Sequence, residues 1–207
     1  MNNNPNFYKN KFELLNLQKA YYIGRSDDIS LGGVPTHAYS EILCKNFDYK
    51  RFVQAVNSLV LHFDALQIEI SDGMQKVADE IKPIEIPYKD ISQLCEEKKA
   101  DYLKRARERI FSMKFDISHF PLIYFEVTSL GEEVIIHFAH DGIIIDGWSH
   151  ENIVYMLEKL YLGEELPQSL SFYDYAQMVK ELKNSEIYQD DKEYWLEKAA
   201  NFPEPPE

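Results

Sequence analysis

Cysteine is scarce in this sequence: only Cys44 and Cys95 occur, far apart and in no CxxC spacing. Each lies within an apolar pattern, so we expect two buried, reduced thiols rather than a disulfide. Basic residues are also scarce, since 22 Lys and Arg stand against 35 Asp and Glu, which gives a net charge of −13 without any basic run. This balance argues against nucleic acid or an anionic membrane as the main partner.

Long hydrophobic runs are absent as well. No apolar stretch approaches the roughly 18 to 20 residues of a membrane span, and the polar first residues hold no apolar signal core. We therefore expect a cytoplasmic protein with no membrane partner. The sequence also contains no GxGxxG, no phosphate-binding loop and no GxSxG turn, so no common nucleotide or hydrolase motif is present.

The sequence does contain enough apolar material for one domain. Hydrophobic residues make up 45% of the 207 residues, which suffices for a single α/β core. Residues 1–10 are Asn-rich and polar and predict a flexible leader, and residues 11–200 are expected to form the domain. Residues 201–207 are Pro-rich, which is typical of a linker or a subdomain boundary.

Hydrophobic periodicity predicts alternating strands and helices. Leu14, Leu17 and Tyr21 indicate a short helix that ends at Gly24, a residue suited to a left-handed cap. A helix of about 15 residues should follow Asp48, which can cap its first turn. Strands are expected over residues 37–45, 66–70, 75–78, 123–128 and 134–139, and further helices over residues 91–113, from about 147, over 171–184 and over 188–200.

The densest group of polar residues lies where the strand at 134–139 ends. A strand end that leads into a loop and a helix is a common place for active-site groups, because rigid elements hold the side chains at a cleft. The best candidate site therefore comprises His137, His140, Asp141, Asp146, Trp148, Ser149 and His150.

Two familiar kinds of site fit this group poorly. In a continuing strand His137 and His140 point to opposite faces, and no flanking spacing matches a zinc pattern, which disfavours a metal site. A Ser-His-Asp triad is no better supported, because Ser149 lies at a helix start, where serine more often caps the helix. Neither a metal nor a serine nucleophile is expected.

A purely structural interpretation also accounts for the residues one by one. Asp146 can cap the helix that follows it, and Trp148 is more often a packed aromatic than a binding platform. His137, flanked by apolar residues, is typical of a hydrogen-bonded core histidine. From spacing alone, catalysis and loop structure remain equal interpretations for Asp141 and Asp146.

A resemblance to a known family adds information that periodicity cannot supply. The segment Asp141-Gly-Ile-Ile-Ile-Asp146-Gly-Trp-Ser149 resembles the DxxxxDxxS signature of heterocyclization domains of nonribosomal peptide synthetases. In those domains the signature replaces the HHxxxDG of ordinary condensation domains. Positions 141 and 142 are Asp-Gly here, so the second His of that ordinary motif is absent.

Three further segments resemble family motifs, in the family's order. Residues 12–25 look like the opening motif FPLTxxQxAYxxGR and depart from it mainly at Glu13 and Leu15. Residues 62–66 and 72–75 are similar to RHxxL followed by NDGxQ, although Leu61 stands where the family has Arg. Residues 194–205 resemble the start of YW…LPxxPxLPL. The matching motif residues expected to be structural are Gln18, Tyr21, Gly24, Arg25 and His62.

The resemblance implies the N-terminal half of such a domain. The expected fold is α/β, a chloramphenicol-acetyltransferase-like lobe with a mixed sheet flanked by helices and the DxxxxD loop at a cleft floor. Complete relatives have a second, C-terminal lobe across that cleft, which is expected to be missing here. The isolated chain is therefore expected to be inactive.

The resemblance also implies a reaction. Complete relatives join an acyl thioester on one carrier protein to the amine of Cys, Ser or Thr on another, then cyclise the side chain and expel water to give a thiazoline or oxazoline. The implied partners are carrier proteins and a C-terminal lobe, and phosphopantetheine arms carry the substrates, with no cofactor bound directly.

The same resemblance suggests roles for the loop residues. Asp141 and Asp146 become catalytic candidates, with Asp141 the group facing the cleft. Asp146 is expected to be more structural, although the preceding strand offers Tyr124 and Glu126 where relatives have an Arg partner. Three neighbours are candidates for substrate binding: His140, Trp148 and Ser149.

Alternatives of other classes stay open. An ordinary condensation domain with a degenerate motif is disfavoured by the Asp-Gly at 141 and 142. A noncatalytic half-domain that binds carrier proteins is favoured by the incomplete length. A homotrimeric acetyltransferase of the same fold would need HxxxDG near its C-terminus, and no His occurs after residue 150.

Overall fold

The computed structural model describes residues 10–26, 28 and 32–203. Contacts within the chain divide it into two compact units, the first ending at Ser169 and the second beginning at Leu170. The expected leader lies outside the described residues except for Asn10, as do residues 204–207 of the Pro-rich segment. The expected domain boundaries therefore stay predictions.

A four-stranded sheet forms the centre of the first unit. Its strands are β2 (His37–Lys45), β7 (Glu133–Asp141), β6 (Ile123–Ser129) and β5 (Tyr88–Asp90), in that order across the sheet. β7 runs antiparallel to β2 and β6, whereas β5 pairs with β6 in parallel. The sheet is mixed, which confirms the expectation.

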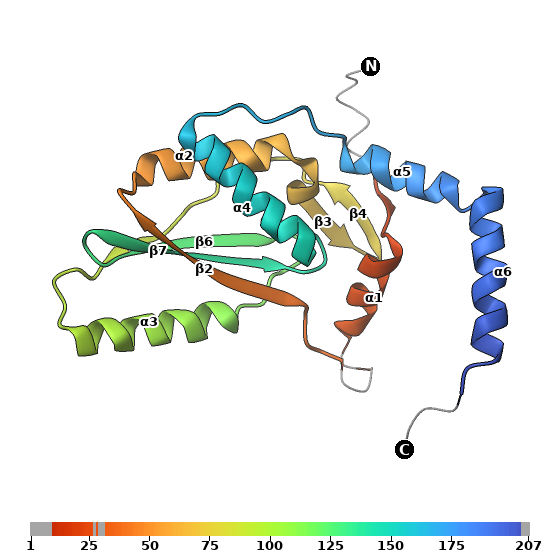
Figure 1. Cartoon of the computed structure of the whole chain (residues 1–207), viewed down its shortest axis with the longest axis horizontal. Coiled ribbons are helices and arrows are strands. Elements are labelled where there is room, and N and C mark those ends of the chain that lie inside the picture. Colours follow the sequence, from red (N-terminus) through yellow and green to blue (C-terminus); the bar gives the residue numbers. More distant parts are fainter. Residues whose placement is uncertain (1–9, 27, 29–31, 204–207) are drawn as a thin grey trace. The chain divides into compact units, whose positions relative to one another are not determined.

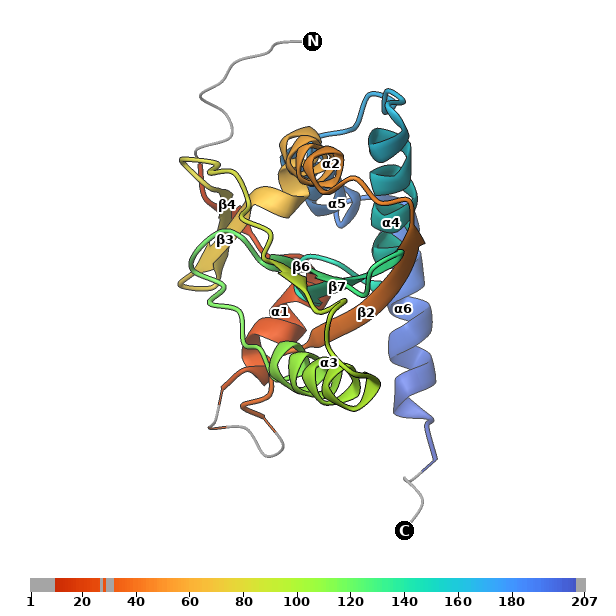
Figure 2. The same cartoon turned by 90° about the vertical axis from the view of Figure 1, so that its left-hand side faces the viewer.

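Helices cover both faces of this sheet. α2 (Tyr49–His62) and α4 (Gly147–Leu162) lie on one face and α3 (Glu96–Phe111) on the other (Figures 1 and 2). The face under α2 and α4 is apolar: Phe125 and Phe138 are paired across β6 and β7, fully buried and stacked with 4.4 Å between ring centroids. Burial of such side chains is the main stabilising contribution to the unit.

The face under α3 is polar instead. Glu41 on β2 accepts hydrogen bonds from Arg107, with 2.7 Å between Nε and Oε1, and Glu126 on β6 accepts from Arg109 at 2.8 Å. α3 itself buries only Ala106 and Ile110. Ion pairs therefore add to a small apolar contact in holding this highly charged helix.

A second, smaller sheet stands next to the end of β7. Its strands β1 (Phe12–Glu13), β4 (Met74–Val77) and β3 (Ile68–Ser71) follow the order β1-β4-β3, with the helix α1 (Asn16–Gly24) after β1 and the short helix η2 (Asp64–Gln67) before β3. The hairpin turn at Asp72 and Gly73 has φ of 54° and 70°, the left-handed region that glycine adopts most easily. Figure 1 shows α1 and this hairpin near the loop that leaves β7.

The second unit contains two helices, α5 (Phe172–Leu182) and α6 (Glu186–Ala200). Ser171 caps α5 and Ser185 caps α6, each accepting a hydrogen bond from the backbone N–H three residues later. No residue of α6 is buried, and Trp195 is exposed. Both helices were expected from their periodicity.

Two expectations about helix ends are wrong. α1 ends at Gly24, but its cap residue is Arg25 in the right-handed conformation, and a left-handed glycine cap occurs instead at Gly163, where φ is 86° at the end of α4. The helix expected over 91–113 begins only at Glu96, and Ile91 lies outside it: its N–H donates to Ser129 O at 2.9 Å and so extends the pairing of β5 with β6.

The cysteine expectation is partly wrong. Both thiols are free, but Cys95 is exposed and Cys44 is only half-buried. Burial raises the pKa of Cys44, which keeps that thiol protonated. In the described ranges no helix is long and apolar enough to cross a membrane.

Candidate functional site

The candidate site is the loop of residues 141–146, which joins β7 to α4. Asp141 fixes its start: the Asp141 N–H donates to Leu122 O at 3.0 Å, and its Oδ1 accepts from Ile143 N–H at 2.9 Å. A carboxylate that accepts from the amide two residues on holds the backbone in a tight turn. The path of the loop is set from its first residue.

Asp141 is also paired with Arg25, the cap residue of α1. An Arg25 Nη atom donates to Asp141 Oδ2, and the two side chains are 17% and 1% exposed. Both carboxylate oxygens are therefore occupied inside the protein. The expectation that Asp141 faces the cleft is wrong, because the charge of Arg25 and a loop amide draw it inward.

Gln18 ties the same loop to two other segments. Its Nε2 donates to Ile143 O at 3.1 Å and to Gln75 Oε1 at 3.0 Å, and Gln75 returns a bond to Gln18 Oε1 at 2.9 Å. Both amides are buried. The segments at 12–25, 72–75 and 141–146, far apart in sequence, thus meet through satisfied polar groups, which cost little to bury.

Gly142 allows the loop to approach β2 closely. Its N–H donates to Thr36 O at 2.9 Å, and a β-carbon at Gly142 would lie 2.9 Å from Thr36 Cβ and closer still to Cγ2. Contact with Thr36 thus explains why residue 142 is glycine, and the charge of Arg25 explains why residue 141 is aspartate.

Asp146 is exposed and begins α4. Its Oδ1 accepts from Ser149 N–H at 2.7 Å, and this hydrogen bond lowers the pKa of Asp146. The helix-cap interpretation is confirmed. Asp146 is therefore neither buried nor unpaired, although it has no Arg partner on the preceding strand. On that strand Tyr124 and Glu126 accept hydrogen bonds from Arg109 instead.

The neighbouring residues differ from one another. Trp148 is 81% exposed at the start of α4, so the expectation that it is a packed aromatic is wrong. Ser149 is half-buried, and its backbone N–H serves the cap of α4. Their expected contact with substrate stays a prediction.

The two histidines of β7 point to opposite faces, as expected. His137 lies on the α3 face, fully buried, between Tyr39 Oη at 2.7 Å and Thr128 Oγ1 at 3.0 Å. Burial lowers the pKa of His137, so the ring stays neutral near neutral pH. The interpretation of His137 as a hydrogen-bonded core histidine is confirmed.

His140 lies on the α4 face and contacts His150 of the candidate group, which in turn contacts Ser40, a residue that the sequence did not single out. His140 Nε2 is 3.0 Å from His150 Nδ1, and His150 Nε2 is 3.1 Å from Ser40 Oγ. Burial lowers the pKa of His140 to about 4. No spacing rule links β2 with α4, so only the fold could bring Ser40 to His150.

A hollow of about 330 Å³ opens beside these side chains. It is lined from α1, β2, the loop and α4, by residues that include Tyr21, Ser40, Asp146 and His150. Asp146, and not Asp141, is thus the aspartate of the loop that lines this hollow.

The remaining motif residue lies elsewhere. His62 ends α2, and its Nε2 is 2.9 Å from Pro167 O, which fixes the segment after α4. Among the residues that the structure describes, no three His, Cys, Asp or Glu side chains are grouped so that they could hold a metal ion.

Comparison with known proteins assigns the family. The family model described as "Condensation domain" matches residues 36–205. The chain belongs to the condensation domain family.

Several members of that family are similar over nearly the whole chain. Bacitracin synthase 1 of Bacillus licheniformis is 30% identical over 201 residues, which is 95% of this chain and 4% of that protein. Phenyloxazoline synthase MbtB of Mycobacterium sp. (strain MCS) is 26% identical over 202 residues, 94% of this chain and 16% of that protein. The chain therefore spans only a small part of these curated relatives.

A solved structure of the family has the same fold. The EpoB NRPS cyclization-docking bidomain from Sorangium cellulosum is 25% identical, with a TM-score of 0.87 over 100% of this chain and 42% of that chain. The expected chloramphenicol-acetyltransferase-like lobe is thereby confirmed. So is the resemblance to synthetase condensation and cyclization domains that the motifs indicated.

Proposed function

We propose that this chain is the N-terminal lobe of a heterocyclization domain. The complete domain joins a carrier-bound acyl thioester to the amine of carrier-bound Cys, Ser or Thr, then closes the side chain onto the new amide and expels water. Phosphopantetheine arms of two carrier proteins deliver the substrates, and a C-terminal lobe completes the cleft.

The observation that carries this proposal is the pairing of Asp141 with Arg25. An ordinary condensation domain has His at position 141, where this chain has a carboxylate built into the fold by Arg25, Ile143 N–H and the Gln18 contacts to the loop. The names of two relatives, a phenyloxazoline synthase and a cyclization bidomain, support the same subtype.

The two aspartates then have different roles. Asp141 shapes the cleft floor as a positioning residue. Asp146 lines the hollow with a carboxylate whose lowered pKa keeps it ionised near neutral pH, so it can attract and orient an ammonium group before reaction. His140, Ser149 and Trp148 stay candidates for substrate contact at the same end of α4.

The test uses a complete condensation domain that contains this chain. A donor carrier protein that bears an acyl thioester is mixed with an acceptor carrier protein loaded with Cys, Ser or Thr, or with Ala as a control. The masses of the products are then measured by mass spectrometry. We expect a product one water lighter than the linear amide with Cys, Ser or Thr and only linear amide with Ala, which has no nucleophilic side chain.

Other outcomes assign other functions. Linear amide from all four acceptors contradicts cyclodehydration and indicates ordinary condensation. No product, with carrier binding retained, indicates a noncatalytic binding domain.

A further inference from the structure

Three side chains form one continuous hydrogen-bonded line on the α4 face of the sheet. Ser40 Oγ lies 3.1 Å from His150 Nε2, and His150 Nδ1 lies 3.0 Å from His140 Nε2. His140 Nδ1 in turn lies 3.4 Å from the backbone oxygen of Asp141. The line thus runs from β2 through α4 to the first residue of the candidate loop.

The last contact fixes the direction of every bond in the line. A backbone carbonyl can only accept, so His140 Nδ1 carries the hydrogen and His140 Nε2, in the neutral ring, is an acceptor. His150 Nδ1 must then donate to His140, and a His150 ring with one hydrogen has none on Nε2. Ser40 therefore donates its hydroxyl hydrogen to His150 Nε2.

The surroundings hold this arrangement in place. His140 is 2% exposed, and burial lowers its pKa to about 4. Its ring is therefore neutral near pH 7. The His150 ring stacks on Phe138 at 5.0 Å between centroids and 15° between planes. His150 is only half-buried, and with Ser40 it borders the hollow of about 330 Å³.

We propose that Ser40 and His150 form a proton relay for the acceptor amine, and that His140 is the residue that positions His150. The proposal rests on the proposed function and takes this hollow as the place where the substrates meet. Neither Asp141, which is buried on the other side of β7, nor the fully buried His137 can take that proton.

The proposed step is balanced in atoms and charge. As the amine nitrogen bonds to the thioester carbon, its proton passes to Ser40 Oγ while the Ser40 hydrogen passes to His150 Nε2. When the C–S bond breaks, its electron pair leaves with sulfur, and the proton returns through Ser40 to the thiolate. The relay ends in its starting state, and the products are an amide and a thiol.

Other ionisable groups face the same hollow. Asp146 and Glu151 are the carboxylates among its lining residues. Tyr21 also lines it, whereas the Tyr39 hydroxyl is engaged by Glu41 and His137. His37 lies near enough to His140 to disfavour a second positive charge there.

The first experiment reads the direction of the hydrogen bonds without any reaction. Nitrogen NMR of labelled histidine in this full chain, near pH 7, distinguishes ring nitrogens that carry hydrogen from those that do not. We expect His150 to carry it on Nδ1 and to lack it on Nε2. Hydrogen on His150 Nε2 contradicts the relay, whatever the reaction proves to be.

The second experiment measures amide formation by the complete domain. His150→Gln should lower kcat by about 100-fold with little change in KM, in the range of general acid–base catalysis. Ser40→Ala should also lower kcat, and Ser40→Thr, which keeps the hydroxyl, should recover most of it. The pH profile of kcat should also change in His150→Gln, because the variant has no ring nitrogen that can accept the proton.

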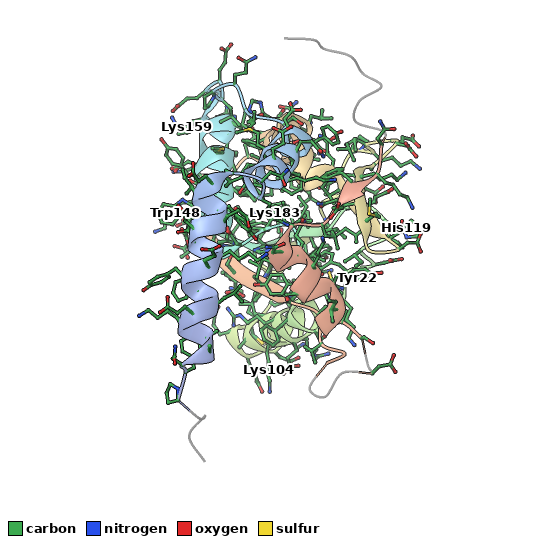
Figure 3. The ribbon with its side chains drawn as sticks, turned by 90° about the vertical axis from the view of Figure 1, so that its right-hand side faces the viewer. Tyr22, Lys104, His119, Trp148, Lys159 and Lys183 are labelled. Atoms are coloured by element: carbon green, nitrogen blue, oxygen red, sulfur yellow. The ribbon has the colours of Figure 1, made fainter. Side chains whose placement is uncertain are left out.

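A matched control separates this effect from a general loss of a histidine. His119 is exposed in its own loop, on the opposite side of the first unit from Trp148 (Figure 3), and His119→Gln should leave kcat unchanged. Thermal unfolding confirms that each variant is folded.

The two proposals fail in different ways. If the unaltered domain forms no amide, the proposed function fails while the NMR result still decides the hydrogen-bond direction. If it is active and His150→Gln keeps full kcat and the same pH profile, the relay is wrong. Equal activity of Ser40→Ala and the unaltered domain excludes Ser40 from it.

Discussion

The loop of residues 141–146 has two sides that are built differently. On one side, which we call the closed side, every side chain is buried or nearly so and paired; it comprises Gln18, Arg25, Gln75 and Asp141. The other, open side borders solvent or the hollow and comprises Ser40, Asp146, Trp148 and His150. The motif residues other than Asp146 and its neighbours thus lie where they shape the loop, and the groups free to meet a substrate lie on the other side.

The largest effect on stability is expected on the closed side, from Arg25→Met. It leaves the Asp141 carboxylate, 1% exposed, without its positive partner, and removing one member of a buried pair costs about 3 to 5 kcal/mol. Urea unfolding measures the change. Lys19→Met, which breaks the exposed Lys19–Glu13 pair, is the control and should cost less than about 1 kcal/mol.

A double variant sharpens this prediction. Asp141→Asn combined with Arg25→Met removes both charges, so it should be more stable than Arg25→Met alone. Equal stability of the two would mean that the ion pair is not what holds the closed side together.

The next effect in size is expected from Gln18→Leu. The change removes the donor to Ile143 O and to Gln75 Oε1, while Gln75 Nε2 keeps its bond to Glu13 O, and this loss costs about 2 kcal/mol. Chemical denaturation gives the value, with Gln93→Leu as a control because Gln93 is exposed. If Gln18→Leu lowers the unfolding free energy by less than Gln93→Leu does, the three motif segments do not depend on this contact.

On the open side, Asp146→Ala should cost only about 1 kcal/mol, the usual value of a helix cap. Because Ser149 N–H lowers the pKa of Asp146 in the folded protein, the charged cap stabilises above the unfolded pKa of roughly 3.9 and is lost as pH falls through the lower folded value. The difference between the unaltered protein and Asp146→Ala should therefore shrink in acid.

Asp146→Asn provides the comparison for that pH dependence. It keeps an oxygen for the cap but has no charge to titrate. The stability difference between Asp146→Asn and Asp146→Ala should be the same at neutral and acid pH, and a shrinking difference would contradict the role of the charge.

The smallest effect is expected from Trp148→Ala. With 81% of the residue exposed, the change should alter the unfolding free energy by less than about 0.5 kcal/mol. A loss of product formation at unchanged stability, measured with the loaded carriers, would support a substrate contact. A large loss of stability would mean instead that Trp148 packs in the folded protein.

Much of the fold could be predicted from the sequence because its causes are local. The strand at 37–45, the hairpin around Gly73 and the Asp48 cap follow from alternation, turn chemistry and a side chain that reaches its own helix. β5 could not be predicted, since its three residues are all exposed and only pairing with β6 makes them a strand. The same pairing takes Ile91 out of the expected helix.

The family and the position of the loop were determined by the sequence alone, because motif order and spacing are properties of the chain. Which aspartate turns inward was decided only by tertiary structure. Asp141 is buried because α1 brings Arg25 to the end of β7, and Asp146 stays exposed because its nearest partner is the amide of its own helix. Ser40 and His150 meet for the same reason: β2 and α4 are distant in sequence and adjacent only once the sheet is covered.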